Sequence, residues 1–591
     1  MKNIFKYLCI SAVVFTLVQC GDPLDKENLA AITADLVWST PEIAEGLVND
    51  MYGSFMPGTA WDFDGFYNST DEGGSIDRNA TISSQYLRGT IISSSYDYYP
   101  YTEIRRINIF LASVDDATFA VETKNVLKGQ ALFWRAWAYF HMVRAYGGVP
   151  LILQAAEPDD TESIFVPRNK TSECFTQIIK DLDEAIPLLN PKNENGRVDK
   201  IAAMAFKGKV LLFKASPQFN RSNNPALWQE AYAANKDALA FADSQGKGLY
   251  DDYRNIWLDE MNREVIMVRR YTYPSYTNSY SQAGMRPLAY ARGAVGFNIP
   301  SLELVNAYPM KDGSRWDPAT MDYRKLHENR DERFYASIAY NGAAPYISPM
   351  FGNENMWTYW FDMDGDPGTG INGKEARQDD ITDFGEFQGN YHSTTSFYPV
   401  KMLDQNITKI NVEDGEVDWI VLRYAEVLMN FAEAANEAGH TDEALSALYQ
   451  IRARARIEAG DGRYGIQATT TDELRKVIQD ERFVEFAFED KRFWDLRRWR
   501  IYASTFNNLE GKYRHGLRIE YNGDVDSRPR FLTDINTVWD QFTVTVINDV
   551  EPTNVLEEDK YSFFGIPTSI LDRNSKLEQN NTWGGTFDPL E

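Results

Sequence analysis

The stretch from Leu127 to Tyr146 restricts the folds open to this chain more than any other segment. Apolar residues recur there at spacings of three or four, which predicts an α-helix. Bulky aromatic residues occupy a second face, so most sides of this helix need to be covered by other elements. The first face consists of Leu127, Ala131, Trp134, Ala138, Met142 and Ala145, and the second of Phe133, Trp137 and Phe140. We therefore expect a helical scaffold built around one buried helix.

Further helical patterns supply partners for that helix. The pattern of that helix itself extends over residues 103–146, and the others cover residues 172–189, 199–215, 226–243, 419–438, 441–458 and 471–489. The last pattern follows Thr470 and includes Glu473, the spacing of a capping box, in which each side chain binds the other residue's backbone N–H. Successive amphipathic helices of about 15 residues favour helix–turn–helix units of the tetratricopeptide kind, although no strict repeat of about 34 residues is visible.

Two long segments differ from the helical ones in composition. Residues 54–100 and 245–415 are rich in Gly, Ser, Asn, Asp and aromatic side chains, so we expect loops and short strands there. Residues 501–591 are expected to be irregular. No linker stands between residues 130 and 500, which favours a single mainly α body over residues 39–591. In that body a helical scaffold (about 39–53, 103–243 and 419–500) carries a loop-rich variable lobe (about 54–100 and 245–415).

The N-terminus has the pattern of an export signal. Lys2 and Lys6 precede an apolar run of 11 residues from position 8 to position 18, which is too short for a permanent membrane span. Cys20 follows in the position of a lipidated cysteine. We expect a signal peptide over residues 1–19 and a lipidated tether over residues 20–38. The alternative is an ordinary signal peptide with an incidental cysteine.

The cysteine count and the charge narrow the class of protein further. Once Cys9 has left with the signal peptide and Cys20 carries lipid, only Cys174 remains, so an exported chain has no intramolecular disulfide. Cys174 lies in an apolar helical stretch and is expected to be a buried small hydrophobe. The chain has 60 basic and 86 acidic residues, a formal charge of −26. Such a chain has no basic excess for binding nucleic acid phosphates.

Several longer motifs resemble one known family. They are Gly129–Phe140 with Tyr146–Leu151, Arg423–Leu428 with Ala432–Glu437, Ile451–Ala455, Glu481–Arg482 with Glu485–Glu489, Arg492–Arg498, and finally Ile566–Pro567 with Leu577–Asn580. In this order and over nearly the whole chain, they resemble the SusD/RagB-like outer-membrane nutrient-binding lipoproteins of Bacteroidetes.

The resemblance implies a fold and a role. The fold would be SusD-like, with tetratricopeptide-like helix pairs as a scaffold and a variable lobe that sets the ligand. The role would be a lipid-anchored, cell-surface protein of the outer membrane that captures an oligo- or polysaccharide. It would pass this glycan to a TonB-dependent SusC-like transporter, with no cofactor and no enzymatic activity. The alternative role is peptide binding, as in the RagB branch.

Charged residues inside the helical motifs have two readings. Acids and arginines stand among apolar residues in two predicted helices, namely Arg423, Glu426 and Glu433 in one, and Glu481, Arg482 and Glu485 in the other. Such residues can form paired, buried networks. The alternative is a pair of catalytic carboxylates in a surface hydrolase. Arginine lowers a carboxyl pKa and so disfavours a general acid, which makes the structural reading our expectation.

Aromatic residues in segments without helical period are the candidates for ligand binding, because loops carry function and a sugar can stack on an exposed ring. The resemblance implies that Asp71 and Arg78 lie where polar ligand contacts tend to fall. The full candidate set is Trp61, Asp71, Arg78, Tyr96, Tyr98, Trp316, Trp357, Tyr359 and Trp360. Phe63, Tyr67, Tyr99, Tyr271, Tyr273 and Tyr276 belong to the same loop aromatics. For each ring, a packing role is the alternative.

Signals for metal ions and catalysis are weak. Asp362, Asp364 and Asp366 could offer oxygen ligands to Ca²⁺, but Pro367 replaces the glycine of an EF-hand loop, so a solvated acidic turn is favoured. His327-Glu328 begins like a zinc-protease motif, yet an aspartate stands where the second histidine belongs. The sequence has no phosphate-binding loop, dinucleotide fingerprint or nucleophile elbow.

Overall fold

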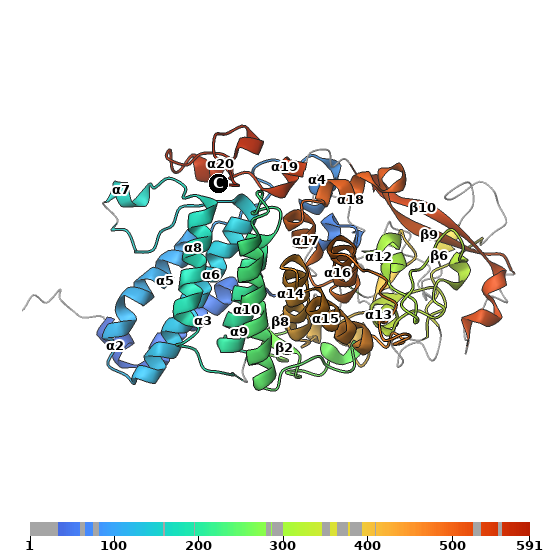
Figure 1. Cartoon of the computed structure of the whole chain (residues 1–591), viewed down its shortest axis with the longest axis horizontal. Coiled ribbons are helices and arrows are strands. Elements are labelled where there is room, and N and C mark those ends of the chain that lie inside the picture. The colour runs from blue at the N-terminus through green and yellow to red at the C-terminus, as the bar shows by residue number, and fades with distance from the viewer. Residues whose placement is uncertain are drawn as a thin grey trace, which may run out of the picture.

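The computed structural model describes residues 34–59, 66–74, 82–157, 160–193, 196–278, 285, 299–344, 355–362, 376–378, 393–407, 409–523, 534–553 and 558–591. Helices predominate, as the sequence predicts. Figure 1 shows one group of helices at one end of the molecule, a second group in the middle and most strands at the other end. Among the described residues, no helix combines the length and apolar character needed to cross a bilayer.

The first helical group comes from the N-terminal part of the chain. It consists of α2 (Ala34–Ser39), α3 (Pro41–Phe55), α5 (Tyr101–Ser113), α6 (Val121–Tyr146), α8 (Thr171–Ala185), α9 (Lys200–Ala215) and α10 (Pro225–Ser244). Helix α6 is the central one, with α3, α5, α8 and α9 packed around it. Its aromatic faces are buried, and Gly147 ends it with a positive φ of 80°. The predicted buried helix is therefore confirmed over residues 121–146, whereas residues 114–120 divide the predicted helical pattern 103–146 into α5 and α6.

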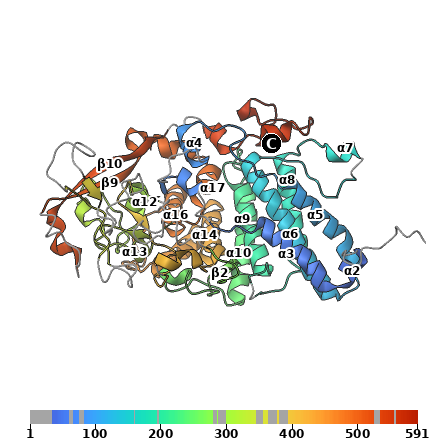
Figure 2. The same cartoon turned by 180° about the vertical axis from the view of Figure 1, so that it is seen from behind.

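The second helical group comes from the C-terminal part of the chain. It consists of α14 (Tyr424–Glu437), α15 (Thr441–Arg454), α16 (Thr471–Glu485) and α17 (Arg492–Arg498). The capping box at Thr470 and Glu473 is present. Consecutive helices of the first group pack on each other, α14, α15 and α16 do so in the second group, and α10 packs on α14 to join the two. Figure 2 shows the same contact between the groups from behind.

Residues 419–423 correct the sequence prediction of a helix starting at 419. They form strand β8 (Trp419–Arg423), which pairs antiparallel with β2 (Val265–Arg269). All five residues of β8 are buried. The physical reason is that a short apolar run buried on every side has no amphipathic period, so its β-branched residues find better packing in a strand.

The strand-rich end contains the remaining sheet structure. A four-stranded sheet has the order β10 (Phe542–Pro552), β9 (Tyr513–Tyr521), β5 (Trp360–Asp362) and β6 (Ala376–Gln378). The prediction that residues 501–591 are irregular is wrong for β9 and β10, the longest strands described. Leu517 and Ile519 of β9 face the core, a period-two pattern that the sequence already contains.

Short elements complete the described fold. The remaining strands are β1 (Gly73–Gly74), β3 (Ile299–Pro300), β4 (Ile338–Ala339) and β7 (Tyr398–Pro399). The remaining helices are α4 (Ile82–Arg88), α7 (Thr161–Ile164), α12 (Leu302–Ala307), α13 (Glu332–Ser337), α18 (Tyr502–Asn507), α19 (Glu558–Ser562) and α20 (Thr568–Leu571). Helix α4 lies inside a segment that the sequence predicts as loop.

The C-terminal segment returns to the first helical group. The Phe564 amide donates to the carbonyl of Ala145 at the end of α6, at 2.8 Å. The buried Arg168 side chain donates to the carbonyl of Glu578 at 2.9 Å and to Oδ1 of Asn580 at 2.8 Å. The end of the chain thus closes over the helices near its beginning.

Candidate functional site

Three of the predicted ligand-binding aromatics belong to the hydrophobic core. Trp357 and Tyr359 are 1% and 0% exposed, and both pack against Phe542 of β10. Trp316 is 6% exposed and lies under the guanidinium of Arg330. The prediction that these rings present a face to a ligand is wrong, because the core contacts already cover them. The sequence around these rings has no helical period, so it gives no sign that the rings are packed in the core.

Asp71, Tyr96 and Tyr98 also have structural roles. The Asp71 carboxylate is buried and accepts two hydrogen bonds from Arg492, at 2.8 and 2.7 Å. The Tyr96 ring stacks on Phe564 with centroids 4.5 Å apart, and burial raises the pKa of its hydroxyl to about 12. The backbone N–H of Tyr98 donates to the Tyr146 hydroxyl. Asp71 is therefore held by Arg492, whereas the rings of Tyr96 and Tyr98 are only partly buried and stay predictions as ligand contacts.

The other predicted site residues stay predictions. Cys20, Trp61, Arg78, Asp364 and Asp366 lie outside the described residues. For Trp360 and Asp362 the structure describes only the backbone, as part of β5. The calcium turn and the lipidated cysteine are therefore untested.

The buried charge network expected from the helical motifs is confirmed. Arg423 is bound by Glu264 at 2.6 Å, by Glu485 at 2.7 Å and by Glu489 at 2.7 Å. Although burial alone would raise the pKa of Glu485, Arg454 and its neighbouring arginines hold that pKa well below its ordinary value. A carboxylate that stays ionised in this way has no proton to give, so it cannot serve as a general acid.

Cys174 also lies where the sequence predicts. It is fully buried, its thiol faces the backbone of Val149, and burial raises the pKa of the thiol to about 12.

Residues 271–276, here called the tyrosine turn, form an exposed aromatic surface directly after β2. Tyr273 and Tyr276 are 53% and 46% exposed. The turn is closed by two backbone hydrogen bonds of 2.7 Å between Thr272 and Tyr276. Tyr271 is buried below, and its ring stacks on Tyr276 with centroids 5.1 Å apart. The turn thus holds two tyrosines outward on a fixed base.

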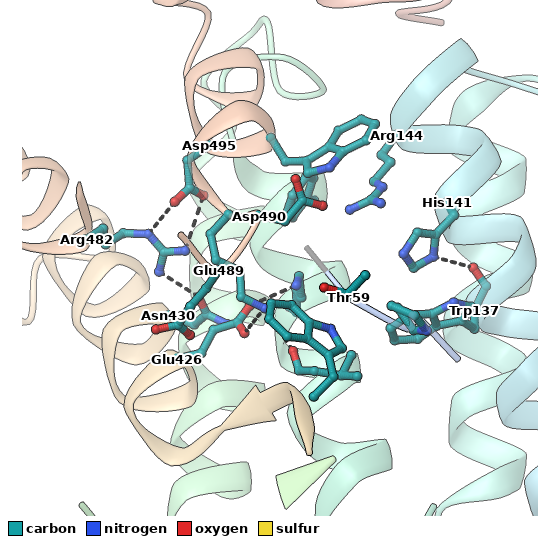
Figure 3. Close-up of a pocket in the computed structure, with 17 residues that line it drawn as sticks. Thr59, Trp137, His141, Arg144, Glu426, Asn430, Arg482, Glu489, Asp490 and Asp495 are labelled. Atoms are coloured by element: carbon teal, nitrogen blue, oxygen red, sulfur yellow. Dashed lines mark hydrogen bonds and ion pairs between the residues drawn. The ribbon is translucent and has the colours of Figure 1, made fainter. Parts of the chain in front are cut away.

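A polar cavity of about 80 Å³ lies where the two helical groups meet. Helices α6 and α9 line one side of it, and β8, α14, α16, α17 and the turn before α17 line the other. Figure 3 shows the side chains converging on it from both sides. Trp137, Trp419, Trp494 and Phe213 contribute aromatic surface to the lining.

Most charged groups of the cavity are paired with each other. Glu426 binds Lys209 at 2.8 Å and Lys491 at 2.9 Å. Burial lowers the pKa of Lys209 to about 8, against the opposing effect of Glu426. Arg482 and Asp495 form a second pair, with a shortest distance of 2.8 Å. The charged groups of these pairs are therefore engaged with each other.

A few polar atoms at the cavity are left over. Among the described residues, Asp490 Oδ1, Arg144 Nε and Trp494 Nε1 are buried without a hydrogen-bond partner. Burial raises the pKa of Asp490 to about 6 and lowers that of Arg144 to about 10. Burial also keeps the pKa of His141 well below its ordinary value, so its ring is neutral. Its Nδ1 lies 2.9 Å from the carbonyl of Trp137 and must donate to it, which leaves Nε2 as an acceptor.

The tyrosine turn and the polar cavity share a wall. The Tyr271 hydroxyl donates to the carbonyl of Gly58 at 2.6 Å. The residues on either side of Gly58, Pro57 and Thr59, line the cavity. Arg269, the last residue of β2 before the turn, pairs in register with Trp419, another lining residue. We treat the two as one candidate site.

Sequence reasoning identified this site only in part. Tyr273 and Tyr276 belong to the loop aromatics that it singled out, but it had no means of separating them from buried rings. Arg144 and Asp490 were missed. A charged residue near the end of the central buried helix is a signal for Arg144. Asp490 takes a left-handed backbone with φ of 55°, which its sequence does not reveal.

Comparisons with known proteins agree with this fold over most of the chain. The family model described as the SusD family matches residues 263–583, more than half of the chain. A second model, described as starch-binding associating with outer membrane, matches residues 49–212. SusD-like protein P2 of Formosa agariphila is 24% identical over 523 residues, which cover 84% of this chain and 92% of that protein.

Solved structures show the same architecture. A SusD-like protein of Bacteroides fragilis is 26% identical, with a TM-score of 0.71, and the match covers 94% of this chain and 99% of that one. A SusD-like protein described as laminarin binding is 18% identical, with a TM-score of 0.60, over 92% and 99% of the two chains. The family resemblance read from the sequence motifs is confirmed, and the chain belongs to the SusD family.

Proposed function

We propose that this protein is a cell-surface lipoprotein that captures an oligo- or polysaccharide, without turnover, and passes it to a TonB-dependent SusC-like transporter. The observation that carries the proposal is the tyrosine turn, where Tyr273 and Tyr276 are exposed beside a cavity with unpaired polar atoms. Exposed rings next to mixed donors and acceptors suit sugars, whose C–H faces are apolar and whose edges carry hydroxyls. Membership of the SusD family and the starch-binding description of the second matching model support the same role.

The energies are consistent with capture and release. Stacking a sugar on one ring buries roughly 100 Å², worth about 2.5 kcal/mol at ~25 cal/mol/Å². Association costs at least ~4 kcal/mol, so one ring cannot hold a ligand alone. Two rings and a few hydrogen bonds give a dissociation constant between about micromolar and millimolar. A ligand held this weakly can be released to a transporter.

Retardation in native gels that contain a panel of polysaccharides tests the proposal. We expect one polymer to retard the wild-type protein, and Tyr276→Ala to weaken binding by about 60-fold, which is the loss of one stacked ring. The free energy of unfolding should fall by no more than about 1.5 kcal/mol, which is the worth of the lost stack on Tyr271, so the variant stays folded. Phe165→Ala is the matched control, because Phe165 is an exposed aromatic next to α7 rather than β2.

Other outcomes separate the rival functions. Retardation that survives both Tyr273→Ala and Tyr276→Ala would remove the tyrosine turn from the proposal. Binding of a peptide library, with no polymer retarding the protein, would favour the peptide-binding role. Release of sugars during long incubation with a polymer would contradict binding without turnover.

The partner and the location need their own test. We expect the full-length protein to copurify from outer membranes with a SusC-like transporter, and Cys20→Ser to release it from the membrane fraction. Recovery of the Cys20→Ser variant in the membrane at the wild-type level would contradict the lipid anchor.

A further inference from the structure

The polar cavity contains more unpaired hydrogen-bonding groups than the packing of the two helical groups requires. Trp494 and Asn430 are 4% and 1% exposed, and among the described residues their Nε1 and Nδ2 atoms have no partner. Asp490 Oδ1 and Arg144 Nε, among the described residues, also have no hydrogen-bond partner. Buried hydrogen-bonding groups are almost always paired, so four unpaired atoms at one cavity indicate an occupant that satisfies them.

The positions of Asp490 and Arg144 narrow the chemistry of that occupant. Figure 3 shows the two side chains facing each other across the cavity, with His141 beside Arg144. The two groups form no ion pair within 4 Å, although the charge pairs below them do, as described for Lys209 and Glu426. One group accepts hydrogen bonds and the other donates them, so an occupant between them has to do both.

Hydroxyl groups satisfy this requirement, because each is a donor and an acceptor. Two neighbouring hydroxyls of a sugar can donate to a carboxylate and accept from a guanidinium at the same time. The aromatic lining, which includes Trp137 and Trp419, offers apolar surface for the C–H groups of the ring. A doubly charged cation or a simple anion would leave one side of the cavity unpaired.

We propose that the polar cavity is a subsite for one terminal sugar unit, whose neighbouring hydroxyls bridge Asp490 and Arg144. This inference rests on the proposed glycan-binding function and adds where and how one end of the glycan is recognised. A volume of about 80 Å³ accepts about six water molecules at 10–15 Å³ each. That space suits one sugar unit and excludes a polymer passing through, so a chain enters by its end while the next units lie toward the tyrosine turn.

Saturation-transfer NMR of the full mature chain with a panel of methyl glycosides of common hexoses and pentoses tests the subsite. We expect at least one glycoside to bind, and Asp490→Asn to weaken it at least tenfold, since hydrogen bonds to a charged group are lost. Asparagine keeps the size of the side chain and tolerates the positive φ at this position. Asp50→Asn is the matched control, because the Asp50 carboxylate is exposed on α3 and does not line the cavity, and it should leave glycoside binding within about twofold.

The other possible results of this NMR experiment also decide whether the cavity is a sugar subsite. Absence of binding by every glycoside, or equal binding to wild type and Asp490→Asn, would mean that the cavity holds only water. Displacement of a bound glycoside by free alanine or dialanine would assign the cavity to a zwitterion instead. If Asp490→Asn does not fold, Arg144→Lys takes its place. It should weaken glycoside binding, because it keeps the charge but loses the planar donors.

The two proposals fail in different ways. Polymer retardation without any glycoside binding would overturn the subsite and leave the proposed function intact. Glycoside binding that depends on Asp490, with no polymer retarding the protein, would support the subsite and contradict polymer capture at the tyrosine turn.

Discussion

At the scale of single residues, burial decides what a side chain of a given type does in this protein. Trp357 is one of the most buried residues, whereas Tyr276 is exposed, although both come from loop-like sequence. The same holds for charges. Arg423 is held by three buried glutamates, whereas Arg106 makes a solvent-exposed pair with Asp50. Residue type therefore predicts a contact only once burial is known.

The buried network predicts a large effect for one substitution. Arg423→Met should lower the free energy of unfolding by about 3–5 kcal/mol, because it leaves buried carboxylates with one cation fewer. Arg106→Ala is the control, and it should change stability by no more than about 0.5 kcal/mol, because its pair with Asp50 is exposed. Urea unfolding curves of the three proteins provide the comparison. Equal stability of both variants would contradict the structural role of the network.

At the scale of elements, the close approach of α10 to the backbone of α9 helps to hold the first helical group together. Gly208 lies in α9 where α10 crosses, and a Cβ there would lie 2.4 Å from Oδ1 of Asn235. Asn235 is fully buried, and its amide nitrogen donates to the carbonyl of Gly208 at 3.0 Å. This glycine is needed for contact distance rather than for a positive φ.

Alanine substitutions at two glycines should therefore have opposite signs. Gly208→Ala should destabilise the protein by about 1–3 kcal/mol, because Asn235 has to move from its buried site. Gly46→Ala in α3 meets open space and should stabilise it by about 0.5–1 kcal/mol through higher helix propensity. Thermal unfolding of the two variants measures the difference. A stabilising Gly208→Ala would show that α9 and α10 can separate without cost.

The contact between α12 and β9 predicts a pH-dependent stability. His515 of β9 lies 2.6 Å from Glu303 of α12, and this hydrogen bond raises the pKa of His515 above its ordinary value. A raised folded-state pKa stabilises the protein below the unfolded-state pKa of about 6.5, and this contribution is lost as the pH rises through the folded-state pKa. The melting temperature should fall over that window in wild type and less in His515→Gln. Parallel curves for the two proteins would contradict the linkage.

At the scale of the whole molecule, the chain closes on itself. Residues near its end fill contacts of the first helical group, where Arg168 donates to Glu578 and Asn580. The cavity of the candidate site forms between that group and the second one. The cavity and the contacts of the C-terminal segment thus both depend on the position of the first helical group.

Removal of the last residues should therefore disturb the whole fold. Truncation after Lys576 leaves the buried Arg168 without two acceptors, and we expect a loss of at least about 3 kcal/mol in the free energy of unfolding. Lys576→Ala is the control, because its pair with Glu162 is exposed, and it should leave stability unchanged. Differential scanning calorimetry measures both. Full stability of the truncated chain would show that the C-terminal segment is only an appendage.

The sequence alone determined the helical scaffold, the central buried helix, the paired charges and the family. The first three rest on local periodicity or on residues whose burial follows from their neighbours in one helix, whereas the family rests on the motifs that resemble it. It missed β8, because a short run buried on all sides has no period, and it missed β9 and β10 although their alternation was visible.

Only the tertiary structure decided which aromatic rings are exposed and which polar atoms meet. Trp316 and Trp357 are covered by segments distant in sequence, whereas Tyr273 and Tyr276 are not. Arg144 and Asp490 lie far apart in the chain and come together only where the two helical groups meet. Exposure and cavities are properties of long-range packing, so no local pattern of residues can fix them.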